Sequence, residues 1–176
     1  FTAGMAAQAA AVLNIAPDHL DWHGGLDSYV AAKARIYRDV ELACVYDVAD
    51  PRLEALVRDA DVAEGARAVG TTIGIPGPGQ LGIADGVLVD RAFHAAPDDP
   101  FRSRSADELA TFDDLAHLAG PGGLAPHVVT NALAAAALAR AHGVPASAVA
   151  AGLREFRPGA HRTALEIGRA SCRVSV

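Results

Sequence analysis

The chain has 176 residues and a net charge of −6, and its length is typical of a single domain. No apolar run approaches the roughly 20 residues of a membrane helix, and an acidic chain without a basic stripe is not typical of a nucleic-acid binder. Its two cysteines, Cys44 and Cys172, are too few for a disulfide framework. We therefore expect a reducing compartment, the cytoplasm, and neither a membrane nor a nucleic acid as partner.

The two ends of the chain differ from its interior. The opening FTAGMAAQAA lacks the basic region of a secretory signal, so we expect the chain to be the middle of a longer protein. Residues 166–176 (EIGRASCRVSV) follow no structural period, and IGRASCR resembles a translated sequencing adapter. We predict one domain at 1–158, a linker at 159–165 and a non-native tail at 166–176, with an ordinary terminal segment as the alternative to that tail.

Short apolar runs that alternate with helical patterns predict an α/β fold with a mostly parallel sheet. The dipeptide Asp85-Gly86 lies between two short apolar runs and is a strong hairpin signal, whereas residues 107–118 have no decisive pattern. In chain order we expect a strand at 10–15, a helix from Asp27 or Ser28 to Arg38, a strand at 41–46, a helix at 51–60, a strand at 67–73, hairpin strands at 80–83 and 87–90, a surface loop at 95–107, a helix at 126–142, and a last helix from Pro145 or Ser147 to Glu155.

The first predicted strand is followed by a polar cluster. Two carboxylates and two imidazoles, those of Asp18, His19, Asp21 and His23, lie within DHLDWH. In open α/β sheets ligands bind at the carboxyl ends of the strands, and these side chains suit metal ligation or acid–base chemistry. The alternative is a polar loop whose side chains satisfy turn and cap hydrogen bonds.

The helix DSYVAAKARIYRD carries Lys33, the single lysine of the chain. Tyr29, Lys33 and Tyr37 are spaced by four residues and so share one helix face. A lysine amine can lose its proton and react, which an arginine cannot do. The alternative is a lysine whose stem packs on the aromatic side chains while its charge stays in water.

Two further positions could contact a nucleotide. Asn131 lies in the first turns of an alanine-rich helix, and its amide has the donor and acceptor that an adenine edge requires. Arg162 follows a Pro-Gly hinge, from which it could clamp a phosphate when a second domain closes. A capping or surface asparagine and a solvated arginine are the alternatives. The glycine-rich GIPGPGQLG is not a phosphate-binding loop, since it has no lysine.

Taken together, these segments resemble the central domain of the ATP-dependent Mur ligases. The resemblance implies an incomplete three-layer α/β domain with a mostly parallel sheet and a β-hairpin, from which the phosphate-loop part is missing. The resemblance is carried by AAVLNIAPDHLDWHGGLDSYVAAKARIY and by APHVVTNALAAAALARAHGV followed by FRPGAHR, and it covers about 1–164. The run is most similar to the D-glutamate-adding branch in its actinobacterial form. The resemblance implies a cytoplasmic ligase of peptidoglycan precursor synthesis that is monomeric at full length. Such a ligase uses ATP and Mg²⁺ to join D-glutamate to UDP-N-acetylmuramoyl-L-alanine through an acyl phosphate.

The resemblance also implies roles for individual residues. His19 would ligate a magnesium ion and lie near the muramoyl substrate, and Tyr29 would line the substrate side of its helix. Lys33 would react with CO₂ to give a carbamate whose negative charge approaches the same ion. Asn131 would contact adenine, and Arg162 would reach the nucleotide phosphates.

Parts of the family pattern are absent from this sequence, among them the phosphate loop GxxGKT/S. Many members have His-Asn where this chain has His127-Val128, which leaves Asn131 as the better nucleotide contact. We expect no ligase activity from these 176 residues alone. Other functions left open are a sibling ligase, including one like folylpolyglutamate synthase, a metal-dependent hydrolase using the DHLDWH cluster, and a non-catalytic α/β module.

Overall fold

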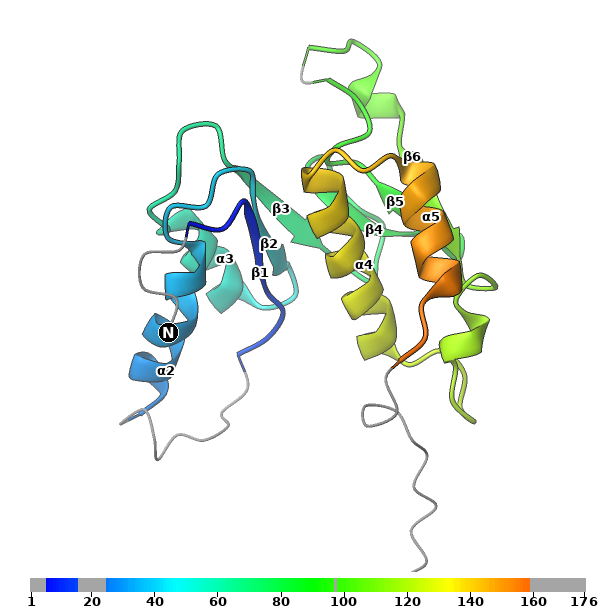
Figure 1. Ribbon diagram of the computed structural model, residues 1–176, viewed down its shortest axis with the longest axis horizontal. Helices are drawn as coiled ribbons and strands as arrows, with labels where there is room; N and C mark the ends of the chain where they lie inside the picture. The colour runs from blue at the N-terminus through cyan, green and yellow to red at the C-terminus, as the bar shows by residue number, and fades with distance from the viewer. Residues whose placement is uncertain (1–5, 16–24, 97, 159–176) are drawn as a thin grey trace, which may run out of the picture.

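The computed structural model describes residues 6–15, 25–96 and 98–158. Within them the chain forms one six-stranded sheet whose strands lie side by side in sequence order (Figure 1). The strands are β1 (Ala9–Val12), β2 (Ala43–Asp47), β3 (Arg67–Thr71), β4 (Gln80–Ala84), β5 (Val87–Asp90) and β6 (Asp107–Thr111).

The sheet is mixed. β1, β2, β3 and β4 run parallel to one another, whereas β5 and β6 are antiparallel to their neighbours. The predicted hairpin is confirmed, and it extends the same sheet rather than standing apart from it. Asp85 and Gly86 both adopt positive φ angles, 50° and 78°, which the tight two-residue turn requires.

Helices cover both faces of the sheet. They are α2 (Leu26–Ala34), α3 (Pro51–Arg58), α4 (Pro126–Ala141) and α5 (Ala146–Glu155). Alternation along the strands decides which core each residue joins. Cys44 packs in a cluster with Tyr37 and Leu53 on the α2 and α3 side, whereas its neighbours Ala43 and Val45 pack with α4. The result is a three-layer α/β/α arrangement, as expected for this fold class.

Several predicted boundaries need correction. Neither Asp27 nor Ser28 caps the first helix, because α2 already begins at Leu26 behind Gly25, whose φ of 129° only glycine adopts readily. The first strand ends at Val12, three residues before the predicted end. The undecided segment 107–118 supplies β6 and a short 3-10 turn at Ala116–Leu118. The long helix ends as predicted, with Gly143 at a φ of 76° directly after its cap.

A buried ion pair joins α4 to the end of the hairpin. The Arg140 guanidinium donates to Asp90 through Nε at 2.7 Å and to Asp107 through Nη2 at 2.5 Å. Asp90 is fully buried, and its other oxygen accepts the backbone amides of Ala92 and Phe93. Both oxygens of this buried carboxylate therefore accept hydrogen bonds, which is the condition for burying a charge.

None of the helices in the described part of the chain is long and apolar enough to cross a bilayer.

Replacing Arg140 with methionine should lower the free energy of unfolding by about 3–5 kcal/mol, because it leaves the buried Asp90 carboxylate without its cation. Urea denaturation of the full-length protein containing this chain would measure the change. Arg154→Met is the matched control, since Arg154 pairs with Asp114 at the surface, where its side chain is 53% exposed. That control should leave stability almost unchanged, and equal losses in the two variants would contradict the prediction.

Candidate functional site at the carboxyl end of the first strand

The predicted site residues fall into two groups. Lys33, Tyr29 and Asn131 lie in the described part of the chain. His19 and Arg162 lie outside the described residues, and so do the other members of the DHLDWH cluster. The described geometry therefore concerns the lysine and its surroundings on one side of the sheet, and the asparagine on the other.

Lys33 points back to the end of β1. Its Nζ donates to the carbonyl oxygen of Asn14 at 2.7 Å, and it lies 4.8 Å from the centre of the Tyr29 ring. The shared helix face of these two residues, expected from their spacing, is thus confirmed. A π face and a carbonyl oxygen both attract a cation, so the amine is held directly beside the carboxyl end of the first strand.

The last residue of this strand and the residues after it are held by two further side chains, to which the sequence assigned no such role. We call Val12–Ile15 the β1 exit. The Tyr37 hydroxyl accepts the Val12 amide at 3.0 Å, and Arg52 Nη2 donates to the Ile15 carbonyl at 3.0 Å. The only available sequence signal was the spacing of Tyr37 from Lys33, and nothing in the sequence pointed to Arg52.

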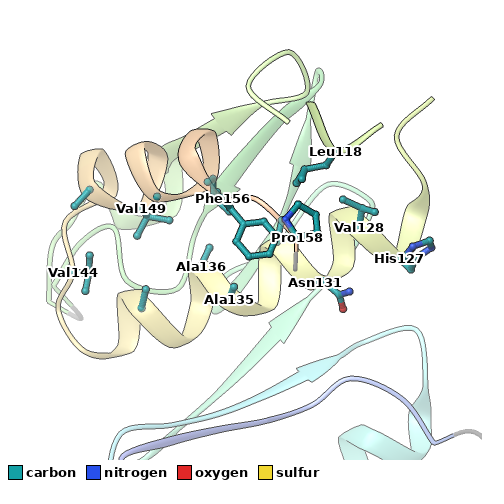
Figure 2. A pocket seen from close by; sticks show the side chains of 15 residues that line it. Leu118, His127, Val128, Asn131, Ala135, Ala136, Val144, Val149, Phe156 and Pro158 are labelled. Carbon is teal, nitrogen blue, oxygen red and sulfur yellow. The ribbon is translucent and has the colours of Figure 1, made fainter. Parts of the chain in front are cut away.

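Asn131 lies on the opposite layer, at the rim of a cavity of about 710 Å³ between α4 and α5 (Figure 2). Small apolar residues of both helices form most of its wall, and Phe156 and Pro158 lie over its middle. The volume is in the range of small-molecule pockets, which combine apolar walls with a few polar groups. An exposed amide at the rim of an apolar groove could orient a flat heterocycle.

The structure does not bring Lys33 and Asn131 together, because α2 and α4 cover opposite faces of the sheet. A single ligand touching both would have to extend over the edge of the sheet. Among the described residues, no three side chains of the metal-ligating types gather at one place. The free thiol of Cys44 is buried, and burial raises its pKa to about 11, so it is not an activated nucleophile.

Comparison with known proteins gives the context of this geometry. Residues 2–74 match the family model described as the Mur ligase middle domain. These residues include β1, α2 and Lys33. Over this stretch the chain is similar to the Mur ligases. The part of the Mur ligase domain that is matched thus holds the lysine and the strand end against which it packs.

Curated Mur ligase relatives extend the similarity through α4 and α5. The chain is 60% identical over 158 residues to the UDP-N-acetylmuramoylalanine–D-glutamate ligase of Streptomyces avermitilis, covering 90% of this chain and 32% of that protein. It is 56% identical to the ligase of the same name from Streptomyces coelicolor, with 90% and 31% covered. The corresponding protein of Leifsonia xyli subsp. xyli is 50% identical, with 95% and 30% covered. The chain thus spans about a third of the length of these relatives.

Proposed function

We propose that the protein containing this chain is an ATP-dependent ligase that joins D-glutamate to UDP-N-acetylmuramoyl-L-alanine in peptidoglycan precursor synthesis. The observation that carries the proposal is the position of Lys33 at the carboxyl end of β1, inside the matched middle domain. The names of relatives up to 60% identical over most of the chain support the same reaction and substrates. We further propose a cytoplasmic location and a monomeric full-length protein.

In the proposed reaction, ATP transfers its γ-phosphoryl group to the carboxylate of the muramoyl-alanine substrate, and ADP leaves. The amine of D-glutamate then attacks the acyl phosphate, and the tetrahedral adduct releases phosphate and leaves an amide. These steps depend mainly on positioning and on neutralising charge. Tyr29 would line the substrate side of α2, and Asn131 would bind adenine at the rim of the apolar cavity.

Lys33 fits a role as a carbamate. The neutral amine would attack CO₂ and lose one proton, which gives a side chain with a negative terminal group and one remaining N–H. That N–H could keep the hydrogen bond to the Asn14 carbonyl, so the carbamate would point away from the β1 exit. An arginine could not form this group, because its guanidinium stays protonated.

Magnesium is part of the proposal through the same residue. The carbamate of Lys33 and the imidazole of His19 are the ligands we propose, and carboxylate-type oxygen suits this hard cation. The ion supplies charge neutralisation for phosphoryl transfer when it is bound. Arg162, which like His19 lies outside the described residues, would contact the nucleotide phosphates.

Lys33→Arg should lower kcat of the full-length ligase by about 100-fold or more, on the scale of losing one preorganised electrostatic group. Lys33→Ala should have an equally low kcat. Formate or acetate should partly restore this kcat, because they supply the missing carboxylate. Steady-state phosphate release would measure both effects. Arg35→Lys, an exposed change next to α2, is the control and should behave as wild type. A wild-type rate in Lys33→Arg would count decisively against the role of this residue.

Asn131→Ala should raise KM for ATP about tenfold and leave KM for the muramoyl substrate unchanged, because one or two hydrogen bonds to the base are lost. Initial rates over a range of ATP concentrations would show this. Thr130→Ala is a matched control, because the Thr130 hydroxyl donates to the carbonyl of Pro126 within its own helix. An unchanged KM for ATP in Asn131→Ala would contradict the proposal that adenine binds at the rim of the apolar cavity.

A further inference from the structure

The backbone beside Lys33 is held at more than one point. Tyr37 is fully buried, and its hydroxyl donates to the Val45 carbonyl at 2.6 Å while it accepts the Val12 amide. Val45 directly precedes Tyr46, the residue paired with Val12 in the parallel ladder. The hydroxyl therefore bridges a donor of β1 and an acceptor of β2 at the carboxyl end of the pair.

The Tyr37 hydroxyl keeps the proton that it donates to the Val45 carbonyl at ordinary pH. Burial raises the pKa of Tyr37 well above its usual range, so the hydroxyl stays protonated. A buried hydroxyl with both a donor and an acceptor satisfied is costly to displace, since either backbone group would lose its partner. The start of the β1 exit is thus fixed to β2.

The end of the β1 exit is fixed to α3. Arg52 donates to both carboxylate oxygens of Asp50, through Nε at 2.8 Å and Nη2 at 2.6 Å. Asp50 also caps α3 by accepting the Arg52 amide at 3.0 Å. The Arg52 side chain holds the pKa of Asp50 below its usual value by donating these hydrogen bonds. The guanidinium that reaches the Ile15 carbonyl is therefore itself oriented by a helix cap.

Lys33 contacts the backbone between these two anchors. Its acceptor, Asn14, lies two residues after Val12 and directly before Ile15. Because the amine donates to this carbonyl oxygen, a shift of the β1 exit either moves the amine with it or breaks the hydrogen bond. The described structure thus couples Lys33 to Tyr37 and Arg52 through the short stretch of backbone from Val12 to Ile15.

We propose that Tyr37 and Arg52 are positioning residues for the Lys33 amine, acting by fixing the β1 exit to which this amine donates. The proposal deepens the proposed function and rests on it for the catalytic role of Lys33. It assigns the two residues no contact with substrate. Their contribution is to hold the reactive nitrogen within the small tolerance that catalysis requires.

The first test needs no substrate. Full-length protein is treated with a limiting amount of an amine-acylating reagent, and modification of Lys33 is quantified by peptide mass spectrometry. Tyr37→Phe and Arg52→Lys should each raise the labelling rate about threefold to tenfold, because the amine loses a held hydrogen bond. Tyr46→Phe and Arg58→Lys are the matched controls and should label as wild type. Arg58 lies on the same helix as Arg52 and pairs only with the exposed Asp59.

The second test is a double-mutant cycle in the full-length ligase. Tyr37→Phe and Arg52→Lys should lower kcat about 10- to 100-fold with little change in KM for ATP. In a Lys33→Ala background supplied with formate, the same substitutions should cost less than about threefold, because the group they position is gone. A purely structural role would lower the rate equally in both backgrounds.

Each outcome has a distinct meaning. If wild-type protein shows no ATP- and D-glutamate-dependent turnover, the proposed function fails, while the labelling test still decides whether Tyr37 and Arg52 hold the amine. If wild type is active but the variants keep wild-type kcat and labelling, the positioning role is overturned. Should Tyr37→Phe fail to fold, the half-exposed Arg52 decides alone, since its side chain is 51% exposed.

Discussion

The hydrogen bonds that hold the β1 exit in place are the constraint on which the described site depends. Within the described residues, β1 has a neighbouring strand on one side only, and the end of such a strand is free to fray unless other groups hold it. Here Tyr37, Lys33 and Arg52 bond to backbone groups of Val12, Asn14 and Ile15, respectively. They come from three different elements, which ties the first strand to the second strand and to both helices of its layer.

The two faces of the sheet carry different kinds of side chain. The α2 and α3 face carries aromatic and charged side chains that reach backbone groups at the strand end. The α4 and α5 face is dominated by alanine, and six residues of α4 are buried. Small side chains allow α4 to lie close to the sheet, but they leave the space between α4 and α5 unfilled. The hydrogen bonds around Lys33 and the open volume beside Asn131 thus follow from the kinds of side chain on each face.

Local signals in the sequence predicted most of the elements. Asp85-Gly86 specified its turn, and Pro126 and Gly143 marked the two ends of α4, because proline fixes its own φ and glycine readily adopts the positive φ that such turns and helix ends require. The predicted cap of α2 was wrong because Gly25, at a φ of 129°, begins this helix without any side-chain hydrogen bond. The ion pair between Asp90 and Arg140 joins residues 50 positions apart, and no local pattern encodes such a contact. Lys33 was singled out because it is the single lysine of the chain, whereas the contact of Arg52 with the carbonyl of Ile15, 37 positions away, has no local signal.

The place of β1 in the strand order has a practical consequence. Within the described ranges no strand lies beyond it, so its outer side presents amide and carbonyl groups without ladder partners. Such a row is a template on which another polypeptide can add by the same hydrogen bonding. In a solution of these 176 residues alone, the nearest available template is a second molecule, and edge-to-edge aggregation is the expected hazard. Biochemical work therefore calls for the intact polypeptide rather than the isolated segment.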